Sequence, residues 1–202
     1  MKPLLSDSER APKHNASVRT MFLPFLLLAV TTVILPRTAA ASDLPRVSRP
    51  MLISVENAMD TSVSLSKTEN PFLISGITRG VYLEGYGAVF TTEVNLIVVS
   101  GAQMMFKPIT NKQDIAQHRQ KKMARLPELK TAVKRAMVDA AVALKTLPEE
   151  ERIVFVALLA KYPWEDVTGL PQQVMLQSTR KKLLEAKNNP AAVDTGIQVM
   201  EN

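Results

Sequence analysis

The chain has 202 residues, a net charge of +6, 46% hydrophobic residues and no cysteine. The lack of thiols excludes disulfides, thiolate metal sites and a cysteine nucleophile. Only two histidines are present, His14 and His118, which argues against a metal site built on several imidazoles. The length is typical of one domain with an additional segment.

The first 41 residues have the pattern of a secretory signal peptide. A basic stretch precedes the apolar run MFLPFLLLAVTTVIL at residues 21–35, and the small residues TAAAS follow soon after it. This order predicts export with cleavage after Ala41. An uncleaved membrane anchor is the alternative, but the run is shorter than the roughly 20 apolar residues that a spanning helix needs. A start at Met21 would remove the basic stretch, so Met1 is preferred.

Cleavage would leave residues 42–202 as the mature protein. It removes five basic and two acidic residues, so the net charge falls from +6 to +3 and gives little support to a polyanionic partner. Residues 42–50 contain two prolines and are expected to form a linker. Residues 51–202 are expected to form a single domain, long enough to build its own core. This part contains no second apolar run that could cross a bilayer.

The first elements of the mature chain are a helix and a strand region. Leu52, Val55, Met59 and Val63 recur at helical spacing, which favours a helix over residues 51–65. Residues 79–100 are rich in Tyr, Val, Phe and Thr, the residue types that favour strands. From residue 88 onward, alternate positions are apolar, which predicts a sheet covered on one face.

A long helix follows. Residues 111–125 are strongly polar, and Pro127 then fits the first position of a new helix. Apolar residues recur at helical spacing from Leu126 to Leu147, so an amphipathic helix is predicted there, with Pro148 after its end.

The C-terminal part alternates short elements. The apolar run RIVFVALLA at residues 152–160 predicts a buried strand, and residues 162–171 a loop. A return strand at 173–178, a basic helix at 179–187 and an edge strand in the tail complete the chain. The expected fold is α+β, a two-layer sandwich in which a mostly antiparallel sheet packs against one long amphipathic helix.

The motif EGYG at residues 84–87 has two structural interpretations. Its glycines either form the turn of a hairpin or mark a bulge in one long strand, and the short first arm favours the bulge. A dinucleotide loop is rejected, because the third glycine of that pattern is replaced by Phe90 and no Walker lysine follows. We also expect Tyr86 and Phe90 to pack together on the covered face of the sheet.

Acidic and aromatic residues supply the candidates for a binding site. Carboxylates can perform acid–base chemistry and aromatic rings can stack on a ligand, although isolated acids are far more often surface or turn residues. No catalytic residue, metal ligand or cofactor is assigned. The ligand-binding candidates are Tyr82, Glu84, Tyr86, Glu93, Trp164, Glu165 and Asp166.

The basic segment at residues 118–135 is interpreted as a solvated helix face. It has no interleaved aromatics for stacking bases, so nucleic acid is not expected as a partner. His118 is accordingly expected to be a solvated surface residue. An anionic component of the cell envelope is the functional alternative for this segment.

Three blocks of sequence resemble a family of uncharacterised exported bacterial proteins. They are RGVYLEGYGAVFTTEVNL at residues 79–96, KKMARLPELK at 121–130 and WEDVTGLPQQVMLQSTRKKLLEAK at 164–187. The first contains the Y-L-x-G-Y-G-x-x-F signature of that family, and the likeness would cover most of residues 51–187. The resemblance implies export and a single fold, and it transfers no activity or catalytic residue.

These observations favour a non-enzymatic periplasmic or envelope protein that binds a small ligand or another envelope protein. The alternative is a carboxylate-dependent hydrolase of an envelope polymer or carbohydrate, using Glu84 or Glu93 with Glu165 or Asp166. A third possibility is an assembly subunit tethered by residues 21–35.

Overall fold

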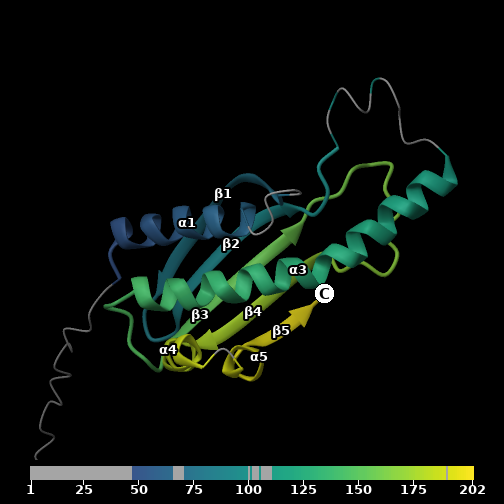
Figure 1. Ribbon diagram of the computed structural model, residues 1–202. Coiled ribbons are helices and arrows are strands. Elements are labelled where there is room, and N and C mark those ends of the chain that lie inside the picture. Colours follow the sequence, from purple (N-terminus) through teal and green to yellow (C-terminus); the bar gives the residue numbers. More distant parts are fainter. Residues whose placement is uncertain (1–46, 66–70, 100, 102–104, 106–110, 190) are drawn as a thin grey trace, which may run out of the picture. The chain divides into compact units, whose positions relative to one another are not determined.

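The computed structural model describes residues 47–65, 71–99, 101, 105, 111–189 and 191–202 (Figure 1). These residues belong to one compact unit within residues 41–202. The expected signal peptide, its cleavage site and most of the linker lie outside the described residues. Within the described ranges, no helix combines the length and the apolar character required to span a bilayer.

Five strands form one sheet in chain order. They are β1 (Leu73–Leu83), β2 (Gly87–Asn95), β3 (Arg152–Leu159), β4 (Gln173–Thr179) and β5 (Gln198–Glu201). Only the β2–β3 pair is parallel, and the other three pairs are antiparallel. A parallel pair needs a crossover, and here the long helix α3 (Lys112–Ala143) lies in that connection (Figure 1).

The helices α1 (Arg49–Ser64), α3 and α4 (Arg180–Asn188) share one core with the sheet, and the short α5 (Ala192–Gly196) packs at its border. The predicted α+β two-layer fold is therefore confirmed. The α1 residues expected to face the core are all buried, and so is the apolar stripe from Leu126 to Leu147. The last two residues of this stripe, Leu144 and Leu147, follow the helix, because α3 ends at Ala143 and not just before Pro148 as predicted. On β2, Ala88, Phe90, Thr92 and Val94 alternate as buried residues, as their parity predicts.

The α3 helix begins fifteen residues before the predicted start, at Lys112 instead of Pro127. Asn111 caps it, because its side chain accepts a hydrogen bond from the Asp114 amide at 2.8 Å. Pro127 lies inside the helix and removes one backbone hydrogen bond without ending it. The buried stripe continues upstream of the proline through His118, Lys122 and Arg125, which explains why the helix continues there.

The EGYG motif is the turn of a hairpin, and the bulge interpretation is wrong. The first arm is longer than expected, because β1 extends back to Leu73. The Tyr86 amide bonds the Leu83 carbonyl at 3.0 Å across the turn, and Gly85 supplies the φ of 77° that such a turn requires. Gly87 has a φ of 135°, and a Cβ there would lie 1.9 Å from the Arg152 carbonyl oxygen. Only glycine fits where β2 meets β3 this closely.

Tyr86 and Phe90 do not lie together on the covered face of the sheet, so this prediction is wrong. Phe90 is fully buried, and its ring lies where a side chain at Gly80 would be. Tyr86 is 42% exposed because it belongs to the turn and not to the strand, and its ring lies beside the Arg152 guanidinium. Parity applies only within a strand, so it does not extend to a turn residue.

Helix α1 covers the free edge of β1 with two carboxylates. Glu56 accepts the Gly80 amide at 2.7 Å, and Asp60 accepts the amide of Thr78 at 3.1 Å. Glu56 is itself paired with Arg49 at 2.6 Å. These acceptors satisfy edge donors that could otherwise pair with another chain.

Candidate functional site

A cluster of ionisable residues lies where α3 extends past the end of β3. The connection from β3 to β4 runs over residues 160–172 and includes the predicted candidates Trp164, Glu165 and Asp166. Figure 1 shows the N-terminal half of α3 beyond the arrowhead of β3, on the side of this connection. Hydrogen bonds from the helix to the connection join the two segments.

Glu165 is the centre of this cluster. Its side chain is 1% exposed, and each carboxylate oxygen has its own partner: His118 Nε2 at 2.7 Å and Lys122 Nζ at 2.6 Å. His118 and Lys122 are four residues apart, so they lie on one face of α3, one turn from each other. The lysine ammonium also donates to the Ala160 carbonyl at 2.9 Å. One carboxylate thus joins two turns of the helix to the connection.

The predictions for the basic segment are corrected by this arrangement. His118 was expected to be solvated, but it is 6% exposed. Lys122 and Arg125 are also buried, and the Arg125 guanidinium lies 4.3 Å from the centroid of the Phe72 ring. The solvated-face interpretation fails for these three residues because the connection after β3 contacts His118 and Lys122, and Phe72, just before β1, packs on Arg125.

Burial lowers the pKa of His118 below its ordinary value of 6.5. Desolvation is the largest cause, and the hydrogen bond and charge of Glu165 oppose it. At neutral pH the ring is therefore neutral, and Nε2 must carry its proton in order to donate to the carboxylate. The charges of the cluster then reduce to one buried pair, Lys122 and Glu165.

Aromatic rings complete the packing of the cluster. The Trp164 ring meets His118 edge-on, with centroids 4.9 Å apart, and stacks on Tyr162 at 5.5 Å. The Tyr162 hydroxyl accepts a hydrogen bond from the buried Asn95 side chain at 3.1 Å. The end of β2 and the connection are thereby held together, and Trp164 serves as a packing residue.

Asp166 lies on the outer side of the same connection. It accepts the Thr168 amide at 2.9 Å and lies 3.4 Å from the Arg119 guanidinium. The hydrogen bonds from Thr168 lower the pKa of Asp166, and Arg119 contributes in the same direction. Asp166 is therefore a turn residue that fixes the shape of the connection.

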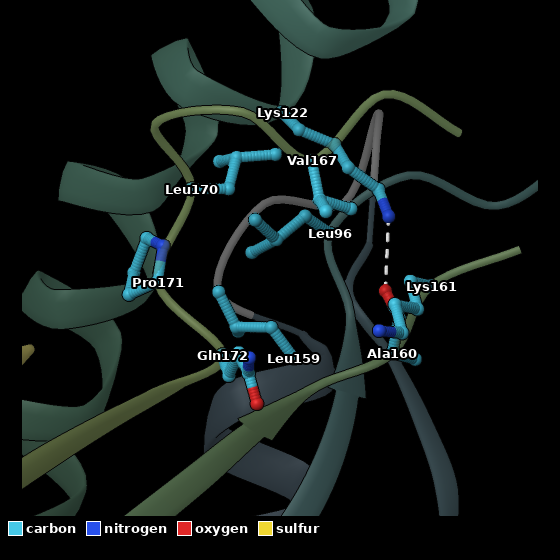
Figure 2. A pocket seen from close by; sticks show the side chains of 9 residues that line it. All are labelled: Leu96, Lys122, Leu159, Ala160, Lys161, Val167, Leu170, Pro171 and Gln172. Carbon is cyan, nitrogen blue, oxygen red and sulfur yellow. Dashed lines mark hydrogen bonds between the residues drawn. The ribbon is translucent and has the colours of Figure 1, made fainter. Parts of the chain in front are cut away.

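A pocket of about 310 Å³ opens beside the buried pair (Figure 2). We call it the β3–β4 pocket, because the connection between these strands supplies most of its walls. Lys122 belongs both to this pocket and to the buried cluster, and Figure 2 shows its hydrogen bond to the Ala160 carbonyl. The described lining residues are Leu96, Lys122, Leu159, Ala160, Lys161, Val167, Leu170, Pro171 and Gln172.

The remaining candidates lie away from this pocket. Glu84 and Tyr86 are in the β1–β2 turn, at the opposite end of the sheet, where Tyr82 donates a hydrogen bond to Glu151 at 3.3 Å. Glu93 is exposed on the face of the sheet opposite the core. The structure therefore groups Trp164, Glu165 and Asp166 in one connection and separates them from Glu84 and Glu93.

The cluster has limited means for catalysis. A histidine bonded to a carboxylate can act as a general base when a nucleophile or substrate reaches its other nitrogen. His118 is almost fully buried, and no serine or threonine hydroxyl in the described ranges is hydrogen-bonded to it. Across the same ranges, no group of three or more His, Asp or Glu could hold a metal ion.

His118 and Lys122 were not among the site residues predicted from the sequence. Their spacing continues the buried stripe of α3 at positions 118, 122, 125 and 129, and this periodicity was the signal that could have identified them. A search for apolar residues at helical spacing does not detect this stripe, because the side chains at 118, 122 and 125 are polar or charged.

No family model, curated protein or solved structure matches this chain.

We predict that the neutral His118 makes folding sensitive to acid. A depressed pKa means that the unfolded chain binds the proton more readily, so the stabilisation is complete above pH 6.5 and is lost as pH falls through the folded pKa. Denaturant titrations between pH 7.5 and 5 should show the free energy of unfolding falling by up to about 1.4 kcal/mol per pH unit from this residue.

The variant His118→Gln keeps an N–H donor for Glu165 but cannot titrate, and it should reduce that slope. Gln117→Asn is the matched control, because it changes an exposed, non-ionisable side chain next to His118 on α3, and it should leave the slope unchanged. An equal slope in the wild type and His118→Gln would contradict the prediction.

Proposed function

We propose that this protein is an exported, non-enzymatic binding module and that the β3–β4 pocket holds its ligand. The observation that carries the proposal is the fixed position of Lys122 in the lining of the pocket. A buried pair with Glu165 fixes this lysine beside an apolar cavity of about 310 Å³. Cavities of about this size with mainly apolar walls and a few placed polar groups are typical of small-molecule sites.

The polar side of the pocket is preorganised for binding. Lys122 is 4% exposed in its side chain and has two acceptors, so its position does not depend on a ligand. The opposite wall is apolar and contains side chains that are still partly exposed, with Val167 at 38%. A ligand would bury these side chains further, and this burial favours binding.

The arrangement favours binding over the hydrolase alternative. That mechanism needs two carboxyls flanking the scissile bond, with at least one able to exchange a proton. Glu165 has both oxygens occupied, and Asp166 is engaged by Thr168 and Arg119. Glu84 lies at the other end of the sheet, and Glu93 lies on the face of the sheet opposite the core. A binding role requires no such pair.

Export is the second part of the proposal. It rests on the charge and apolar pattern of residues 1–41 and on the resemblance of three sequence blocks to exported bacterial proteins. Intact mass of the protein recovered from a bacterial periplasm should match a chain that begins at Ser42. A recovered chain that retains residues 21–35 would favour the tethered alternative.

We predict that filling the pocket abolishes ligand binding without unfolding the protein. The probe is 1-octanol, whose apolar chain matches the pocket wall. Leu170→Trp should place an indole in the cavity, so the amide NMR shifts that 1-octanol causes around Leu96, Val167 and Gln172 should disappear.

Leu158→Trp is the matched control. Leu158 is a leucine on β3 that is 41% exposed and lies outside the lining of the pocket. This variant should bind 1-octanol as the wild type does. Unchanged binding by Leu170→Trp, or shifts that map to another surface, would refute the pocket as the ligand site.

A further inference from the structure

We infer that the ligand of the β3–β4 pocket is a small amphiphilic carboxylate. Its anionic head would lie beside Lys122 and Lys161, and its carbon chain against the apolar wall. This inference rests on the proposed function, because it specifies the ligand class of the same pocket. It follows from the charge, the donors and the shape of the lining, taken in turn.

The charge of the lining has one sign. Among the nine described residues that form it are two lysines and no acid. Lys161 is exposed and forms no ion pair with another described residue. Two acids of the connection lie next to the lining in sequence: Glu165 is buried with its two oxygens occupied by His118 and Lys122, and Asp166 is engaged by Thr168 and Arg119. Any charge preference of the pocket is therefore for an anion.

Lys122 supplies a directed donor as well as charge. An ammonium group has three N–H donors, and two of them point to the Ala160 carbonyl and to Glu165. The third can bond a ligand oxygen. Because Glu165 balances the charge of Lys122, the uncompensated positive charge at the pocket belongs to Lys161. Lys122 thus acts as the hydrogen-bond donor to the ligand, and Lys161 as its counterion.

The apolar wall defines the rest of the ligand. It is formed by Leu96, Leu159, Val167, Leu170 and Pro171, and Figure 2 shows Leu96, Leu159 and Leu170 around the same space. At about 30 Å³ for each water-sized group, the cavity of about 310 Å³ holds about ten such groups. An inorganic anion would not bury the apolar wall, and a hydrocarbon would make no polar contact with Lys122 or Lys161. A carboxylate with a chain of about eight carbons matches both features.

The test compares three probes of equal chain length at pH 8: octanoate, 1-octanol and octylamine. Dissociation constants come from NMR titration of the purified protein. Octanoate should bind about tenfold more tightly than 1-octanol, the ratio expected for one additional charge-assisted hydrogen bond. Octylamine should bind most weakly, because its ammonium would lie beside two lysines.

Lys161→Gln should reduce the preference for octanoate and leave the affinity for 1-octanol unchanged. Lys145→Gln is the matched control, since Lys145 is an exposed lysine outside the pocket, and it should retain the full preference.

The outcomes separate this inference from the proposed function. If 1-octanol binds as tightly as octanoate and Leu170→Trp abolishes both, the pocket is a binding site but the inference of an anionic ligand is wrong. If neither probe binds, or if both bind unchanged to Leu170→Trp, the proposed function fails and the inference fails with it.

Discussion

The carboxylate of Glu165 is the interaction on which the candidate site depends. It takes one donor from His118 and one from Lys122, both from the same face of α3. These contacts hold the β3–β4 connection against the N-terminal half of α3. The Lys122 bond to the Ala160 carbonyl adds a backbone contact at the start of that connection. The buried Glu165 carboxylate therefore fixes the connection that forms most of the pocket walls.

Such a pair is costly to bury, which bears on its role. Desolvation of two charges can exceed their attraction, so an apolar replacement would often stabilise a fold equally well. The buried pair instead gives the connection one position and leaves a lysine at the edge of a cavity. Because His118 is neutral, it adds no third charge to the contact between Lys122 and Glu165. The cluster is thus better explained by positioning than by a gain in stability.

The sequence was informative where burial follows apolar periodicity and uninformative where it does not. The stripe of α1, the alternation along β2 and the strand at residues 152–159 all bury apolar residues, and each was predicted. The first half of α3 buries His118 and Lys122 instead, so it was predicted to be solvated. Glu165 was a candidate, but its partners lie more than forty residues away in the chain. Their meeting depends on the crossover from β2 to β3, which no local pattern encodes.

A double-mutant cycle on Lys122→Met and Glu165→Gln tests the central claim most directly. Each single variant should lower the free energy of unfolding by about 3 kcal/mol, because the remaining partner stays buried without its counterpart. The double variant should cost at least about 2 kcal/mol less than the two single effects together. The exposed pair Lys134–Asp194, at 2.5 Å, is the reference and should couple by less than about 1 kcal/mol. Additive effects at Lys122 and Glu165 would show that the buried pair does not hold the connection on α3.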